Sequence, residues 1–175
     1  MMDKKLILSG IGGQGIVLMG QYLGYAAIKR GAKVTLAPSY GQEKRGSYVH
    51  CQLAIGDELA APSISKADAV FIMDDDSFRL YEPCVKSGGT LLMNTDVISL
   101  ESKRTDIKIV KLPLSRLAIE AGSLKAANMV GLGALIRHGD ILPVEDIREI
   151  IREKMKPAVL EINLKALELG YQFEG

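Results

Sequence analysis

A glycine-rich junction near the N-terminus places the strongest constraint on how this chain can fold. Residues 5–9 form an apolar run of strand length, Gly10-Ile11-Gly12-Gly13-Gln14-Gly15 follows directly, and residues 16–30 carry apolar side chains at helical spacing. Glycines let the backbone turn sharply, and the helix behind them offers free N–H groups at the positive end of its dipole. This succession predicts a strand, a glycine loop and a helix, with a phosphate or carboxylate as the natural ligand of the loop.

The loop also satisfies the G-x-G-x-x-G pattern of dinucleotide-binding folds, through Gly10, Gly12 and Gly15. A dinucleotide site needs an acidic residue about 20 residues beyond the glycines to bind the ribose hydroxyl. Residues 35–39, where it would lie, contain neither Asp nor Glu, which argues against such a site. Two other interpretations stay open. The glycines allow tight packing of the strand against the helix, or they form a site for a ligand or for the backbone of a partner.

The composition narrows the class of protein. The 175 residues include 22 basic and 21 acidic side chains. The resulting net charge of +1 lacks the positive excess that is typical of nucleic-acid-binding proteins. No apolar run reaches the roughly 18 residues that a membrane span needs. Two cysteines, 33 positions apart and without a second pair, suggest neither a disulfide framework nor a zinc site. We therefore expect a single domain over residues 1–175, located in the cytoplasm, with no nucleic-acid or membrane partner.

Short apolar segments alternate with helical patterns along the chain. Predicted strands cover residues 5–9, 33–37, 48–55, 69–73, 90–94 and 107–112, and predicted helices cover 16–30, 77–85, 115–121, 125–138, 144–154 and 159–169. Pro38 is predicted to stop the second strand, and Gly88-Gly89 to form a turn. The first strand, helix and strand predict a right-handed βαβ unit with parallel strands. The whole pattern predicts an α/β fold, a three-layer α/β/α sandwich with a mostly parallel, Rossmann-like open sheet.

A second polar segment, Tyr40-Gly41-Gln42-Glu43-Lys44-Arg45-Gly46, follows the second strand. In a βαβ unit it leaves the carboxyl end of that strand, at the same edge as the glycine loop, and ligands bind at this edge in open α/β sheets. Arg45 is able to form paired hydrogen bonds with a phosphate or carboxylate. An ordinary solvated loop is the alternative.

Acid–base and nucleophilic groups are scarce. His50 falls inside a predicted strand and His138 near a helix end, and we interpret both as structural. The run of aspartates at 74–76 resembles a magnesium ligand set, but a solvated cluster at the start of a helix explains it better. Cys51 is expected in the core of a strand rather than as a reactive thiol.

A third segment, Asn128-Met129-Val130-Gly131-Leu132-Gly133-Ala134-Leu135, combines a helical pattern with small residues. Glycine inside a helix costs about 0.5–1 kcal/mol relative to alanine, so two of them suggest close approach of another backbone. Packing inside the monomer and a subunit interface both explain this face.

The segments 10–15, 39–46 and 128–134, in this order and spacing, resemble the gamma subunit of the 2-oxoacid:ferredoxin oxidoreductases, and the resemblance covers essentially the whole chain. It implies an enzyme that oxidatively decarboxylates a 2-oxoacid, such as pyruvate or 2-oxoglutarate, and transfers the acyl group to coenzyme A. Electrons pass through iron–sulfur clusters to ferredoxin. Thiamine diphosphate and the clusters belong to other subunits, and the expected partners are alpha and beta subunits, with a delta subunit as a further candidate.

The resemblance implies that this chain alone is inactive, holds no metal or cofactor and has no catalytic residue. Its two loops are expected near the thiamine and coenzyme A region, where they contact phosphate groups or a partner subunit. The residues expected at this site are Gly10, Gly12, Gly13, Gln14, Gly15, Tyr40, Glu43, Arg45 and Gly46. Two alternatives stay open: an independent nucleotide-binding oxidoreductase that uses the G-x-G-x-x-G loop, and a structural homo-oligomer built on the helix with Gly131 and Gly133.

Overall fold

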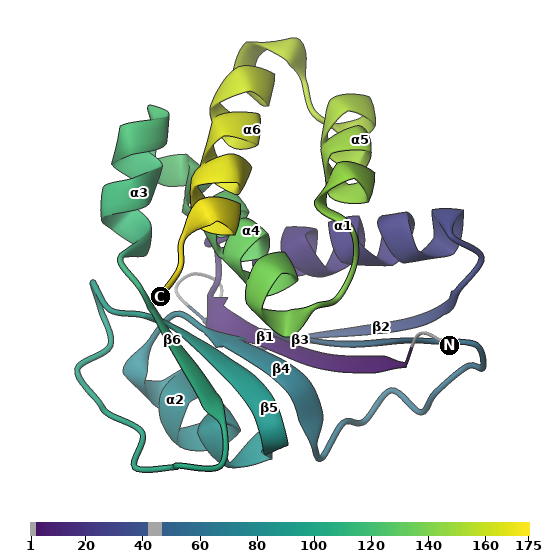
Figure 1. Cartoon of the computed structure of the whole chain (residues 1–175), viewed down its shortest axis with the longest axis vertical. Helices are drawn as coiled ribbons and strands as arrows, with labels where there is room; N and C mark the ends of the chain where they lie inside the picture. Colours follow the sequence, from purple (N-terminus) through teal and green to yellow (C-terminus); the bar gives the residue numbers. More distant parts are fainter. Residues whose placement is uncertain (1–2, 42–46) are drawn as a thin grey trace.

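A six-stranded mixed sheet forms the centre of the molecule (Figure 1), and the structure, a computed structural model, describes residues 3–41 and 47–175. The strands are β1 (Lys4–Ile11), β2 (Lys33–Tyr40), β3 (Tyr48–Gly56), β4 (Ala67–Ile72), β5 (Val85–Asn94) and β6 (Lys108–Leu112), in the order β2-β3-β1-β4-β5-β6. Strand β3 is antiparallel to both of its neighbours, and the remaining pairs are parallel. Five strands therefore share one direction, and their carboxyl ends meet at one edge.

Helices cover both faces of the sheet (Figure 1). They are α1 (Ile16–Lys29), α2 (Asp75–Tyr81), α3 (Leu114–Ala121), α4 (Ala127–Gly139), α5 (Val144–Lys154) and α6 (Pro157–Gln172), with short 3-10 turns η1 (Glu82–Cys84) and η2 (Leu124–Ala126). Helices α1 and α4 lie on one face, with α3, α5 and α6 packed on them, and α2 covers the other face. The predicted three-layer α/β/α arrangement is confirmed, with a thicker layer on the α1 side. No helix in the described part of the chain combines the length and apolar character needed to cross a membrane.

The alternation of side chains along the strands divides the core into two parts. Leu6 and Leu8 of β1 face the large core under α1 and α4, whereas Ile7 faces the smaller core under α2. In β4, Phe71 faces the large core and Ile72 the smaller one, and both are fully buried. Burial on both faces explains why these central strands appear as continuous apolar runs in the sequence.

The order of the strands differs from the predicted βαβ unit in one respect. Strands β1 and β2 share a direction, but β3 lies between them and pairs with both. The prediction that Pro38 stops the second strand is wrong, because β2 continues to Tyr40 and Pro38 pairs with Cys51. Strand β2 is the edge of the sheet, where a proline without an N–H group is tolerated on the solvent side.

The predicted turn at Gly88-Gly89 is also wrong. Strand β5 runs through both glycines, and its pairing with β4 shifts register between Ala67 and Ala69. Gly88 has a φ of 75° within this irregular stretch, a conformation that glycine adopts without strain. The glycines therefore accommodate a bulge inside a strand and do not end it.

The glycines of the third segment pack inside the monomer. A Cβ atom at Gly131 would lie 2.5 Å from Cζ of Phe71, and one at Gly133 would collide with the backbone carbonyl of Leu167 in α6. Gly170 of α6 lies in the same way against the carbonyl of Val130 in α4. Internal helix packing explains this segment, and the homo-oligomer interpretation loses the feature on which it rested.

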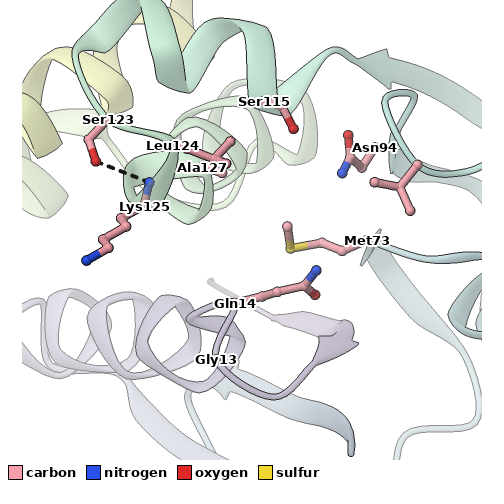
Figure 2. Close-up of a pocket in the computed structure, with 10 residues that line it drawn as sticks. Gly13, Gln14, Met73, Asn94, Ser115, Ser123, Leu124, Lys125 and Ala127 are labelled. Atoms are coloured by element: carbon pink, nitrogen blue, oxygen red, sulfur yellow. Dashed lines mark hydrogen bonds between the residues drawn. The ribbon is translucent and has the colours of Figure 1, made fainter. Parts of the chain in front are cut away.

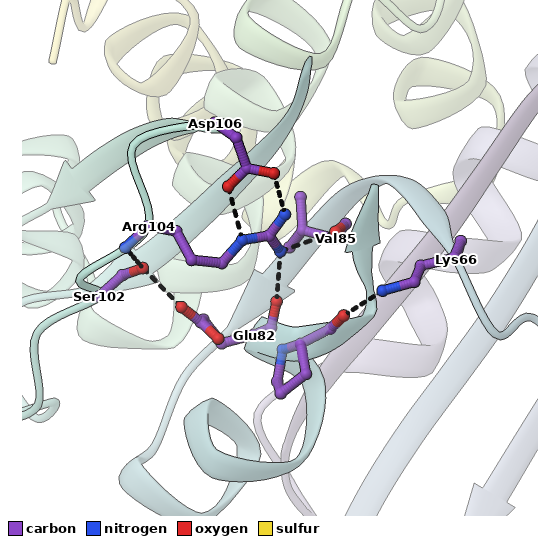
Figure 3. A network of polar contacts seen from close by, with 7 residues as sticks. Lys66, Glu82, Val85, Ser102, Arg104 and Asp106 are labelled. Carbon is purple, nitrogen blue, oxygen red and sulfur yellow. Dashed lines mark hydrogen bonds and ion pairs between the residues drawn. The ribbon is translucent and has the colours of Figure 1, made fainter. Parts of the chain in front are cut away.

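The long connection between β5 and β6 is held by Arg104 (Figure 3). Its guanidinium donates to both carboxylate oxygens of Asp106, at 2.9 and 2.6 Å, and to the carbonyl oxygens of Val85 at 2.7 Å and Glu82 at 3.2 Å. These hydrogen bonds lower the pKa of Asp106 to about 2. One side chain thus ties the connection to η1 and to the start of β5.

Candidate functional site

A cavity of about 540 Å³ lies at the carboxyl edge of the sheet, between the glycine loop and the segments that follow β4, β5 and β6 (Figure 2). Gly13 and Gln14 line it after β1, Met73 after β4, and Asn94 at the end of β5. Helix α1, which follows β1, and helix α2, which follows β4, lie on opposite faces of the sheet. Neighbouring strands whose connections leave to opposite faces form a crevice, and open α/β sheets bind ligands in such crevices.

The glycine loop is shaped around the side chain of Gln14. Its Oε1 accepts a hydrogen bond of 2.7 Å from the backbone N–H of Ile11. A Cβ at Gly10 would lie 2.5 Å from that oxygen, so glycine at this position leaves room for the folded side chain. Gly13 and Gly15 have φ angles of 95° and 76°, in the left-handed region that favours glycine.

The N-termini of α1 and α4 meet at this loop. The side-chain amide of Asn128, in the first turn of α4, fills the space in which a Cβ of Gly15 would stand. Neither helix has a side-chain cap on its first turn. Helix α4 continues from η2, where the N–H of Ala127 donates to Leu124, so the free N–H groups near the cavity are those at the start of α1, where they favour a negative charge.

The second polar segment begins and ends beside the glycine loop. The N–H of Gly12 donates to the carbonyl of Ser47 at 2.8 Å, and the N–H of Gly41 donates to the carbonyl of Tyr48 at 2.7 Å. The prediction that both loops share one edge is confirmed for these ends. Tyr40 is 65% exposed at the end of β2. The remaining predicted residues of this segment lie outside the described part of the chain, namely Glu43, Arg45 and Gly46.

Asn94 lines the cavity but is absent from the predicted site. Its residue is only 3% exposed, and its Oδ1 accepts a hydrogen bond of 3.1 Å from the N–H of Asp96. Figure 2 shows its amide nitrogen turned toward the cavity, with Ser115 close by. The sequence signal was its position at the carboxyl end of a predicted strand, which by itself marks many residues without a function.

The aspartates at 74–76 begin a helix, as predicted, but they are not uniformly solvated. Asp74 is 7% exposed and accepts hydrogen bonds from the N–H and Oγ of Ser77, at 2.8 and 2.7 Å. Asp75 binds Ser99, and Asp76 pairs with Arg79. In residues 3–41 and 47–175, no group of three or more His, Cys, Asp or Glu side chains is arranged to hold a metal ion.

The two histidines and Cys51 have structural surroundings. His138 accepts from Lys108 at Nδ1, 2.9 Å away, and donates from Nε2 to the carbonyl of Phe173 at 2.8 Å. The His50 ring lies 5.5 Å from the ring of Tyr81. Burial lowers the pKa of both histidines, and it raises the pKa of the Cys51 thiol to about 12. These groups lie away from the cavity, and the described residues that line it include no acid–base pair.

Comparison with known proteins identifies the family. The family model of pyruvate ferredoxin/flavodoxin oxidoreductase matches residues 5–173. The 2-oxoglutarate synthase subunit KorC of Methanocaldococcus jannaschii is 34% identical over 98% of this chain and 94% of its own length.

Two solved structures share the fold. The keto/oxoacid ferredoxin oxidoreductase gamma subunit from Geobacter sulfurreducens aligns with a TM-score of 0.84 and 26% identity, over 97% of this chain and 96% of that one. A 2-oxoglutarate:ferredoxin oxidoreductase from Magnetococcus marinus, with 2-oxoglutarate, coenzyme A and succinyl-CoA bound, aligns with a TM-score of 0.85 and 23% identity. The alignment covers 97% of this chain and 30% of the Magnetococcus chain. The resemblance drawn from the three sequence segments is confirmed, and the chain belongs to the pyruvate ferredoxin/flavodoxin oxidoreductase family.

Proposed function

We propose that this chain is the gamma subunit of a 2-oxoacid:ferredoxin oxidoreductase and completes, with partner subunits, a site for coenzyme A-dependent chemistry. The overall reaction converts a 2-oxoacid, coenzyme A and oxidised ferredoxin into acyl-CoA, carbon dioxide and reduced ferredoxin. Thiamine diphosphate and iron–sulfur clusters on partner subunits would supply the carbon–carbon cleavage and the electron transfer. The observation that carries this proposal is a cavity whose described lining residues offer hydrogen-bond donors and include no acid–base pair, on a chain of this family.

Large apolar side chains around the cavity support a role in an assembly. Tyr40 at the end of β2 is 65% exposed, Leu124 in η2 is 57% exposed, and Ile11 at the end of β1 is 37% exposed. Exposed apolar side chains at this edge of the sheet are typical of a surface that a partner covers. We propose that the alpha and beta subunits, and a delta subunit where the enzyme has one, meet the chain at this edge.

Within that interface, the glycine loop would bind and orient while the partners carry the reactive groups. Gly13 would present its backbone N–H and Gln14 its side-chain Nε2 to a phosphate of coenzyme A or to a partner's backbone, beside Gly12, whose own N–H donates to Ser47. Arg45, Glu43 and Gly46, on the neighbouring loop, would close the same site. The chain would act in the cytoplasm, as one domain over residues 1–175.

Reconstitution of the complex tests this function. The chain is co-expressed with its candidate partner subunits, and acceptor reduction is measured with 2-oxoglutarate, pyruvate and branched-chain 2-oxoacids, with and without coenzyme A. The proposal predicts activity that depends on coenzyme A and on this chain. Full activity of the partners without the chain would contradict it.

The independent nucleotide-binding oxidoreductase makes a different prediction. It requires tight binding of NAD, NADP or FAD by the isolated chain, although β2 ends without an acidic residue for the ribose. Calorimetry with each dinucleotide separates the two functions.

A further inference from the structure

We infer that the 540 Å³ cavity itself binds the anionic group of a small molecule, a carboxylate or a phosphate, through the side-chain amides of Asn94 and Gln14. This inference deepens the proposed function and rests on it only in the choice of edge, because the cavity is formed entirely by this chain. Binding to the chain alone tests it separately from the activity of the complex.

Asn94 presents a hydrogen-bond donor at the floor of the cavity. A backbone N–H donates only to the oxygen of an amide, so the bond from Asp96 fixes Oδ1 on the side away from the cavity. The Nδ2 group faces the cavity and has no hydrogen-bond partner among the described residues (Figure 2). Asn94 is only 3% exposed and lines the cavity, so this donor is positioned to pair with an acceptor on a ligand in the cavity.

Gln14 is oriented in the same manner from the opposite wall. The N–H of Ile11 binds Oε1, which leaves the Nε2 group to the cavity (Figure 2). Two amides on different elements, each fixed through its oxygen by the backbone, therefore present only N–H donors to the same space. Such a pair selects a ligand rich in acceptors, as carboxylates and phosphates are.

The charges around the cavity have the sign that an anion requires. No aspartate or glutamate is among the described residues that line it, whereas Lys125 stands at its rim. The uncapped first turn of α1 adds its positive dipole end. The carboxylate of Asp96 accepts a hydrogen bond of 2.6 Å from the backbone N–H of Ser115 and does not line the cavity.

The size and walls of the cavity indicate more than a bare ion. A volume of 540 Å³ falls within the range of about 300–1,000 Å³ typical of small-molecule sites. Met73, Val97 and Leu124 give it apolar walls. We therefore assign it to an anionic group carried on an apolar body or chain.

Isosteric replacement of each neutral amide by a negative carboxylate tests the assignment. Gln14→Glu and Asn94→Asp keep the oxygen that binds the backbone and replace the donor by a carboxylate oxygen. Gln14→Glu is the primary variant, because Gln14 is the less buried of the two and tolerates a charge better. Gln52→Glu is the matched control: Oε1 of Gln52 also accepts from a backbone N–H, that of Ile64 at 2.5 Å, but Gln52 does not line the cavity.

The side-chain amide signals of the labelled full chain are followed by NMR during titration with inorganic phosphate, 2-oxoglutarate or coenzyme A. We expect the signals of Asn94 and Gln14 to shift saturably with one or more of these probes. Gln14→Glu should weaken that binding about tenfold or more, and Gln52→Glu should leave it unchanged. A response to 2-oxoglutarate alone assigns a carboxylate, and a response to phosphate or coenzyme A assigns a phosphate. Unshifted amide signals with all three probes, or equal affinity in the Gln14→Glu variant, would overturn the inference.

Discussion

Gly133 of α4 lies directly against the backbone carbonyl of Leu167 in α6, so closely that no side-chain carbon fits between the two helices. Gly170 of α6 makes the reciprocal approach to the carbonyl of Val130. This contact fixes the outer helices on α4, and α4 begins at the cavity. The position of the cavity wall therefore depends on a backbone-to-backbone contact about 9 Å away along the helix, at about 1.5 Å of rise for each of the six steps from Ala127 to Gly133.

Replacement of Gly133 by alanine should destabilise the protein. The added methyl group meets backbone atoms of α6 that cannot rotate away, and overpacking of this kind costs about 1–3 kcal/mol of unfolding free energy. Chemical denaturation of Gly133→Ala measures this loss. Gly24→Ala in α1 is the control, since a Cβ there lies 3.4 Å from a methyl group of Val34, and it should be neutral or slightly stabilising. Equal stability of the Gly133→Ala variant and the wild type would contradict the described packing.

The two left-handed glycines of the loop should respond differently to alanine. Gly13 has a φ of 95° with open space around its missing side chain, so Gly13→Ala carries only a backbone cost of about 1–2 kcal/mol. Gly15→Ala adds a collision with the amide of Asn128 and should lose more. Urea unfolding of both variants gives the comparison. A larger loss in Gly13→Ala would mean that Asn128 does not occupy the space beside Gly15.

The two cysteines should differ sharply in their reactivity. Cys51 is fully buried, and burial raises the pKa of its thiol to about 12, whereas Cys84 is partly exposed. The thiolate is the reactive form, so iodoacetamide at pH 8 should label Cys84 well before Cys51 in the folded chain. Mass spectrometry locates the label, and labelling in denaturant, where both should react, is the control. Alkylation of folded Cys51 at the rate of Cys84 would contradict its burial.

His138 should make the stability depend on pH. The folded state lowers the pKa of this ring, through burial first, from its ordinary value of 6.5. Below pH 6.5 the unfolded chain therefore takes up a proton that the folded chain resists, and the unfolding free energy falls as the pH drops toward the folded-state pKa. Denaturation between pH 7.5 and 5 should show this fall.

His138→Phe isolates the contribution of that ring, because His50 shifts in the same direction and remains in the variant. The variant should be less stable at pH 7.5, since the carbonyl of Phe173 loses its donor, and it should have a shallower pH dependence. An unchanged pH dependence would show that His138 does not titrate differently in the folded chain.

The sequence predicted the parts of the fold that depend on local pattern. Burial on both faces gave β4 and β5 their continuous apolar runs, and the glycine loop marked the start of α1. The insertion of β3 between β1 and β2 was not predictable in this way, because strand order depends on long-range pairing. The predicted strand end at Pro38 and the predicted turn at Gly88 were wrong for a related reason. An edge strand tolerates a proline, and a bulge tolerates a glycine, although each residue would break a regular central strand.

The candidate site was predicted in outline only. The shared edge of the two loops followed from the direction of the strands, and the ends of both loops bear it out. Asn94 was missed because its role depends on burial and on the hydrogen bond from Asp96, neither of which leaves a mark in the sequence. The run of aspartates predicted a solvated Asp74, and this prediction is wrong for the same reason. The Asp74 side chain is buried and accepts a hydrogen bond from Ser77, a contact that the sequence does not reveal.

Affinity purification of the tagged chain from its native source tests the central claim most directly. The account predicts that the chain purifies in a stoichiometric complex with subunits that carry thiamine diphosphate and iron–sulfur clusters, and that this complex reduces ferredoxin with a 2-oxoacid and coenzyme A. A chain that purifies alone, under conditions in which those subunits are present in the extract, would contradict it.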